Sequence, residues 1–116
     1  MTSITVDSIP LRLVDDGFIP LVRGISHTLQ LETLVLETCD IGDDSVRLLI
    51  ENWKPDSALQ SLCLARNRIG PDGAQLLLRA APGHSSFHVL DLTGNKRIGF
   101  EGLRKIGEEL SAQSHL

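Results

Sequence analysis

One template occurs three times in this chain, and its copies begin at a constant interval, at Leu31, Leu59 and Phe87. Each copy carries a large apolar residue at positions one, four and six and Cys or Asn at position nine. The first two copies add Ile-Gly at positions eleven and twelve. A self-similar period of about 20 to 50 residues is typical of a solenoid, in which each repeat packs only against its neighbours.

The template combines a strand with a helix. Apolar positions four and six alternate with mostly polar positions, which is typical of a half-buried strand. Acidic residues or proline then open a segment with helical apolar spacing, and Pro55 and Pro82 end two of these segments. We predict strands near Thr5–Asp7, Thr33–Glu37, Ser61–Ala65 and Val89–Thr93, and helices that start near Gly17, Asp44, Pro71 and Glu101.

This template resembles the leucine-rich repeat of the ribonuclease-inhibitor type, whose ninth position alternates between Asn and Cys. Cys39, Asn67 and Asn95 occupy that position here. The resemblance implies an α/β fold, a right-handed leucine-rich-repeat solenoid that forms a horseshoe segment, with parallel strands on the concave face and helices on the convex face. We predict that Asn67 and Asn95 are buried and bond the backbone of adjacent turns, because buried polar groups left unpaired are costly. Cys39 should fill the equivalent place.

The chain is predicted to be a single leucine-rich-repeat domain, residues 1–116, with repeats at about 3–30, 31–58, 59–86 and 87–115. The same interval, counted back from the first good copy, places Val6 under Leu34 and Ser8 under the core Leu36, so the first repeat is degenerate and cap-like. The fourth repeat has one extra residue in its turn, and Leu116 then aligns with the start of a fifth. We expect further repeats, a second copy or a protein partner to cover the C-terminal edge.

Composition agrees with stacked aliphatic layers, since the chain has twenty leucines but only three Phe and one Trp. No apolar run approaches the roughly 18 residues of a membrane span, and the first residues lack the features of a signal peptide. Cys39 and Cys63 should lie about 13 Å apart along neighbouring strands, too far for a disulfide. We therefore predict a cytoplasmic, intracellular protein.

Charge is divided unevenly along the chain. Residues 1–58 have a net charge of −6 and residues 59–116 a net charge of +2, within a total of −4. This balance does not favour a nucleic-acid partner. It favours head-to-tail contact between copies through electrostatic complementarity, so a homo-oligomer is one of the assemblies that would cover the C-terminal edge.

Candidate partner-binding residues lie on the exposed strand positions and at the strand exits. Arg66 is predicted to lie diagonally near Glu37 and within reach of Asp91, as in a cross-strand charge network. A basic rim should follow the strand exits of repeats three and four, although an ordinary solvated edge would have the same composition. The candidates are Glu37, Cys63, Arg66, Arg68, Asp91, Lys96 and Arg97.

No catalytic, cofactor-binding or metal-binding residue is predicted. The pairs Asp15–Asp16 and Asp43–Asp44 recur at helix starts, where the helix dipole explains them better than a metal ion. His84 and His88 have no companion ligand at metal-binding spacing, so both are interpreted as loop residues. Residues 94–99 lack the order of a phosphate-binding loop.

Two further residues have ordinary structural explanations. Cys63 has no base next to it in the sequence that would make it a catalytic thiol. Trp53 occupies a repeated core position and is interpreted as a packing residue.

These observations predict a non-catalytic protein–protein interaction module or assembly subunit, because no nucleophile, base or ligand set converges. The alternative is a GTPase-activating or regulatory role resembling that of Ran GTPase-activating proteins, which share this repeat type but use a longer arc. Innate-immune receptors and cytoskeletal cap proteins like tropomodulin also carry this repeat. The sequence contains no nucleotide-binding domain or actin-binding segment that would favour either.

Overall fold

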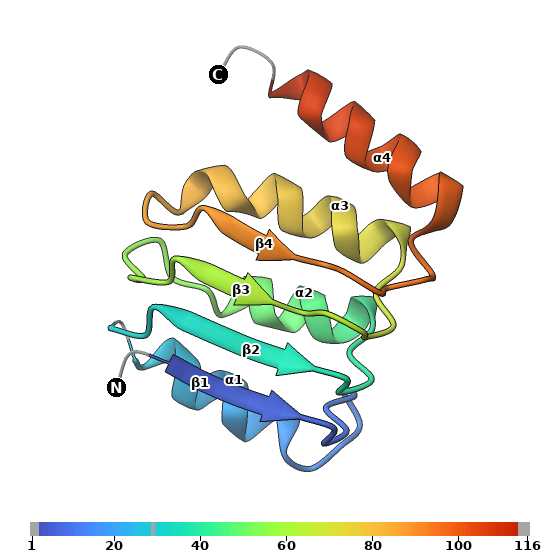
Figure 1. Ribbon diagram of the computed structural model, residues 1–116. Helices are drawn as coiled ribbons and strands as arrows, with labels where there is room; N and C mark the ends of the chain where they lie inside the picture. Colours follow the sequence, from blue (N-terminus) through green and yellow to red (C-terminus); the bar gives the residue numbers. More distant parts are fainter. Residues whose placement is uncertain (1–2, 29, 114–116) are drawn as a thin grey trace.

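Strands and helices alternate along the chain in the computed structural model, which describes residues 3–28 and 30–113 (Figure 1). The strands form one parallel sheet in the order β1-β2-β3-β4, which confirms the predicted α/β solenoid. The predicted start of a fifth repeat, Leu116, lies outside the described residues. The elements are β1 (Ser3–Asp7), α1 (Phe18–Ser26), β2 (Thr33–Glu37), α2 (Asp43–Glu51), β3 (Ser61–Cys63), α3 (Pro71–Ala80), the short 3₁₀ turn η1 (Ala81–Gly83), β4 (Val89–Asp91) and α4 (Gly99–Ala112).

All helices lie on one side of the sheet, and α1 and α2 are seen behind β1 to β3 in Figure 1. Each of the first three helices follows its strand and precedes the next parallel strand, as a β-α-β crossover requires. The other side of the sheet carries no helix of the described chain, and we call it the open sheet face. Among the described residues, no helix has both the length and the apolar character needed to cross a lipid bilayer.

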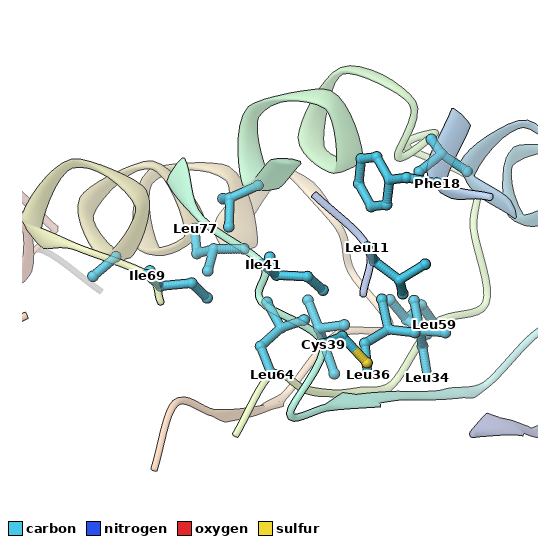
Figure 2. Packing of buried hydrophobic residues seen from close by; sticks show 14 of the residues in the cluster. Leu11, Phe18, Leu34, Leu36, Cys39, Ile41, Leu59, Leu64, Ile69 and Leu77 are labelled. Carbon is cyan, nitrogen blue, oxygen red and sulfur yellow. The ribbon is translucent and has the colours of Figure 1, made fainter. Parts of the chain in front are cut away.

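The core lies between the sheet and the helices. Leu34 and Leu36 of β2 and Leu62 of β3 are buried, with Phe18 and Leu77 of the helices packed in the same cluster (Figure 2). Burying one such side chain stabilises the fold by about 1.5–3 kcal/mol. The template leucines at positions four and six therefore point from the strands into the core, as the alternation predicts.

Helices begin within two residues of the predicted positions. Pro71 takes the first helical position of α3, where its missing N–H costs nothing. The sequence analysis attributes both Asp pairs to the dipole at a helix start. This explanation is wrong for Asp15–Asp16, because α1 has no acidic residue in its first turn. Asp15 instead accepts hydrogen bonds from the backbone N and the guanidinium of Arg12.

The register of the first strand also differs from the predicted one. Ile4 pairs with Leu34 and Val6 pairs with Leu36, so the step from the first strand to the second is two positions longer than the template interval. A shift of two residues keeps the same side chains on the same face of a strand, so the inward positions are filled by Ile4 and Val6. Ser8 therefore does not replace a core leucine. The link between β1 and α1 is longer than that between β2 and α2, while the link after α1 is shorter than that after α2.

The residue after each strand exit shows why this register holds. Ser8, Thr38, Arg66 and Gly94 all have positive φ, at 62°, 56°, 55° and 79°. The template interval would place Pro10 in this column, but proline is locked near a φ of about −65°. These left-handed residues turn the chain away from the sheet, and β3 and β4 end before the predicted Ala65 and Thr93.

The C-terminal end of the described solenoid is apolar, as expected, but not all of its apolar residues are exposed. Leu103 and Leu110 of α4 are 63% and 57% exposed. Phe100, for which the template makes no prediction, is 92% exposed. Four further apolar residues of this end pack against the core and are partly buried: Phe87, Leu90, Leu92 and Ile106.

Candidate functional site

The asparagines at template position nine form hydrogen bonds between neighbouring repeats. Asn67 is buried, and its side-chain oxygen accepts hydrogen bonds from the backbone N–H groups of Cys39 (2.8 Å) and Ile41 (3.1 Å) in the preceding repeat. Its amide nitrogen donates to the carbonyls of Leu36 (2.7 Å) and Leu64 (3.0 Å), and at 3.3 Å to that of Ala65. The geometry predicted for this asparagine is therefore observed.

Asn95 makes a similar but smaller set of contacts one repeat later. Its oxygen accepts from the N–H of Ile69 (3.1 Å), and its nitrogen donates to the carbonyls of Leu64 and Leu92, both at 2.9 Å. Cys39 is buried at the equivalent place, with its sulfur 3.2 Å from the carbonyl oxygen of Glu37. Burial raises the pKa of the Cys39 thiol above its usual value, which suits a structural, unreactive side chain.

The open sheet face brings four of the seven predicted binding residues together. Arg66, after β3, forms a salt bridge with Glu37 at the end of β2. Gly94 makes room for this arginine, since a Cβ added at Gly94 would lie 3.0 Å from Cγ of Arg66. Cys63 lies beside them with its sulfur 3.7 Å from a carboxylate oxygen of Asp91. The predicted contact between Arg66 and Glu37 is confirmed.

Asp91 is held in its charged form on this face. The backbone N–H of Thr93 donates to its carboxylate at 2.9 Å. Hydrogen bonding to Thr93 is the main cause that lowers the pKa of Asp91 below its usual value, with smaller contributions from Cys63 and the charge of Arg66. Asp91 therefore presents a carboxylate to solvent at neutral pH.

The other three candidates line two hollows near the strand exits. Arg68 and Arg97 line a cleft of about 620 Å³ at the strand exits, together with Arg12. Lys96 lines an open groove of about 530 Å³ beside α4. The cleft carries as many acids as arginines: Asp40, Asp43 and Asp44.

Two acids of the cleft already have partners in this chain. A carboxylate oxygen of Asp43 accepts a hydrogen bond of 2.8 Å from the N–H of Gly70, at the start of the next repeat's helix. Asp44 lies 3.7 Å from Arg47. The Asp43 carboxylate thus holds the backbone of Gly70, the residue before α3, across a repeat junction. Among the described residues, no cluster of three or more His, Cys, Asp or Glu side chains is placed to hold a metal ion.

His84 is a structural residue that sequence reasoning missed. It lies in the loop after η1, as predicted, but its ring is buried, with Nδ1 3.0 Å from the carbonyl of Ala80 and Nε2 3.0 Å from that of Trp53. The ring also stacks on Trp53, with centroids 3.7 Å apart and planes 9° apart. Phe87 meets the Trp53 ring edge-on at 4.7 Å, so Trp53 is a packing residue, as predicted. His88 is exposed.

Comparison with known proteins supports the repeat assignment. A protein family described as "Leucine Rich repeat" matches residues 57–78 and 83–107. The human "NACHT, LRR and PYD domains-containing protein 13" is 30% identical over 95 residues, which cover 82% of this chain and 9% of that protein. The chain thus spans about a tenth of the length of this relative.

A solved structure gives the same architecture. The C-terminal domain of tropomodulin from Caenorhabditis elegans superimposes with a TM-score of 0.77, over 97% of this chain and 66% of that one. Its sequence identity of 21% makes this a likeness of fold alone. Together with the repeated template, the parallel sheet and the ninth-position amides, these matches identify the chain as a leucine-rich-repeat protein.

Proposed function

We propose that this chain is a non-catalytic protein–protein interaction module and that the open sheet face binds its partner. The observation that carries the proposal is the group formed by Glu37, Cys63, Arg66 and Asp91, whose side chains are at least partly exposed. The parallel strands fix the backbone beneath them, so little conformational entropy is lost on binding. Repeat solenoids use such extended surfaces for binding.

The charge of this face favours a partner segment with basic side chains. Asp7 lies directly opposite Glu37 in the β1–β2 register, and Asp91 adds a third carboxylate two strands away. Like charges directly opposite each other destabilise a sheet. Arg66 offsets only part of this charge, because it pairs with Glu37. Lysine or arginine side chains of a partner would offset the rest.

A pair of matched variants tests this proposal. The first variant combines Glu37→Gln, Arg66→Gln and Asp91→Asn on the open sheet face. The control combines Arg47→Gln with Glu51→Gln on the exposed side of α2. Both variants should keep the wild-type circular dichroism spectrum, since the substituted side chains lie outside the core.

Partners that co-purify with the wild-type chain are identified by mass spectrometry, and their affinities for both variants are then measured. We expect the control to bind like the wild type and the sheet-face variant to bind at least about tenfold more weakly. Binding that is unchanged in the sheet-face variant would place the partner on another surface.

A GTPase-activating role is the alternative, and neither the comparisons nor the contacts of the described residues favour it over binding alone. Measuring GTP hydrolysis by a small GTPase with and without this chain distinguishes the two. An intracellular location is also proposed, supported by the free thiols of Cys39 and Cys63.

A further inference from the structure

We propose that the partner of the open sheet face is an α-helix that lies across the four strands and carries two basic side chains about eleven residues apart. One of these side chains pairs with Asp7 on β1, and the other pairs with Asp91 on β4. This helical partner presupposes the binding function proposed above for the same face and gives it a shape and a charge pattern.

No helix of the described chain covers the open sheet face, since all of them lie on the opposite side of the sheet (Figure 1). Repeats added at either end of a solenoid place their strands beside the existing sheet edges, next to β1 or β4, and not over the face of the sheet. The exposure of this face is therefore a property of the repeat fold and does not depend on where the chain begins or ends.

Asp7 and Asp91 present carboxylates on this face that form no ion pair with any described residue. The Asp7 carboxylate accepts a hydrogen bond of 2.8 Å from the hydroxyl of its neighbour Ser8, and Asp91 accepts the backbone N–H bond described above. The third carboxylate, that of Glu37 on β2, already pairs with Arg66. The unpaired negative charge therefore lies on the two outer strands, with a neutral pair between them.

The strand register gives the distance between the two unpaired carboxylates. Asp7 pairs with Glu37 at the end of β2. Asp91 pairs with Cys63, which in turn pairs with Val35, two residues earlier in β2. Three strand intervals of about 4.8 Å and a shift of two residues of about 3.3 Å along the strands therefore place the Cα atoms of Asp7 and Asp91 about 16 Å apart. The line that joins them runs obliquely across the sheet.

An α-helix places side chains at this spacing on one of its sides. It rises about 1.5 Å per residue and turns once every 3.6 residues or so, and residues i and i+11 therefore lie about 16 Å apart and point in nearly the same direction. In an extended segment, the side chains that face the sheet recur about every 6.8 Å, so two of them lie about 14 or about 20 Å apart. The spacing of the carboxylates therefore favours a helix over an extended segment.

The surface between the carboxylates allows a helix to approach closely. The line that joins them crosses β2 between Val35 and Glu37 and crosses β3 beside Cys63. Thr33 and Ser61, earlier in the same strands and on the same face, are also small and uncharged. The helix residues i+4 and i+7 face this strip, and small or apolar side chains there pack against Val35 and Cys63 without burying an unpaired charge. Binding then combines this contact with electrostatic complementarity at both ends of the helix.

Two synthetic peptides of identical composition test the helical partner by fluorescence anisotropy. A covalent cross-link keeps both helical, and both carry alanine or leucine at i+4 and i+7. The first peptide has lysine at i and i+11, whereas the second has its second lysine at i+9, on the opposite side of the helix. We expect the first peptide to bind at least about tenfold more tightly than the second.

Variants of the chain show whether the two carboxylates cause this preference. Asp7→Asn combined with Asp91→Asn should remove it, while the control Arg47→Gln with Glu51→Gln on α2 should keep it. Asp7→Lys combined with Asp91→Lys should reject the lysine peptide and bind a peptide with glutamate at i and i+11.

Cys63 reports whether the peptide lies on the open sheet face. Its thiol is partly exposed beneath the path of the helix, so its reaction with a thiol reagent should slow in proportion to the fraction of chain bound to the first peptide. Equal binding of the two lysine peptides, no binding of either, or binding that leaves Cys63 as reactive as before would each overturn the helical partner.

Failure of the helix is distinguishable from failure of the binding function itself. A co-purified partner that is lost in the variant of Glu37, Arg66 and Asp91, but that the first peptide does not displace, would contradict the helix and leave the binding face in place. A co-purified partner whose binding is unchanged in that variant would contradict both.

Discussion

The junction between repeats two and three and the junction between repeats three and four use the same residue type to different extents. Asn67 makes five side-chain hydrogen bonds across or beside the middle junction. Asn95 makes three at the next one. At the first junction, Cys39 supplies only weak sulfur contacts to carbonyl oxygens, at 3.2 and 3.6 Å. The hydrogen bonds of the ninth-position side chains are therefore most numerous at the middle junction.

This difference has a physical consequence, because the stability of a repeat protein is approximately a sum of repeat and nearest-neighbour terms. His84 also ties repeat three to repeat two. It lies at the end of the sheet where the strands begin, and its ring contacts the carbonyl of Trp53 in repeat two. The third junction is instead tied by ion pairs between helices, Asp72 with Lys105 and Arg79 with Glu109. We expect the outer junctions to open first and the middle junction last.

The largest effect should come from Asn67→Ala. The substitution leaves two buried N–H groups and up to three carbonyls without a side-chain partner, and each unpaired buried group costs about 1–3 kcal/mol. We expect a loss of at least about 3 kcal/mol, measured by urea unfolding. Asn95→Ala should cost about half as much, because fewer groups lose their partner.

Arg68→Ala is the control for this comparison, since Arg68 is the exposed neighbour of Asn67. It should change the free energy of unfolding by no more than about 0.5 kcal/mol. Equal losses for Asn67→Ala and Asn95→Ala would show that the middle junction has no special role.

His84→Ala should have the next largest effect. It removes two ring contacts to carbonyl oxygens and the stacking on Trp53, for a loss of about 2 kcal/mol in the free energy of unfolding. His88→Ala is the matched control, because His88 is exposed and contacts only the nearby Ser86 carbonyl. The interpretation fails if both substitutions cost the same.

A smaller effect is expected from the ion pair between Asp72 and Lys105. The hydrogen bond from Lys105 lowers the pKa of Asp72 below its usual value of 3.8, and Asp72 raises the pKa of Lys105 above 10.5. The carboxylate contribution is therefore present above pH 3.8 and lost as pH falls through the folded pKa of Asp72. The ammonium contribution is lost in turn as pH rises through the folded pKa of Lys105.

Melting curves of the wild type and of Asp72→Asn test this pH dependence. We expect the wild type to melt slightly higher at neutral pH and the two curves to meet in acid. The difference should shrink in high salt, because both side chains are at the surface. A difference that persists below the lowered, folded-state pKa of Asp72 would have a cause other than this ion pair.

The sequence was sufficient for the repeats and their asparagines because the template recurs at one fixed spacing. The fixed spacing gave the wrong register for β1. It placed Ser8 in the core and placed Pro10 at the turn position that has positive φ in the other repeats. The longer step observed between β1 and β2 satisfies both constraints, since it brings Ile4 and Val6 inward and Ser8 to the positive φ. Only the backbone conformation of the turn makes proline unacceptable there, and the apolar pattern carries no information on it.

The candidate site was predicted in part. The contact of Arg66 with Glu37 follows from strand pairing, which a repeat register determines. The groove that Lys96 lines does not follow from the register, because Lys96 lies in the turn that contains the extra residue. The burial of His84 was not predicted because its partners are backbone carbonyls, one of them in the preceding repeat. The sequence does not show which carbonyl groups a side chain contacts.

The two thiols should differ in how fast they react with a thiol reagent, a difference that is measured without unfolding the protein. Cys63 is partly exposed on the open sheet face and should react with a thiol reagent at once, whereas buried Cys39, with its raised pKa, should react only through opening of the first junction. The Cys63→Ala variant isolates the slow reaction. In that background, Asn67→Ala should speed the labelling of Cys39 more than Asn95→Ala does, because Asn67 holds the backbone N–H of Cys39. If each variant instead speeds the labelling of Cys39 by the factor that its own loss of unfolding free energy predicts, Cys39 is exposed by unfolding of the whole solenoid and not by local opening.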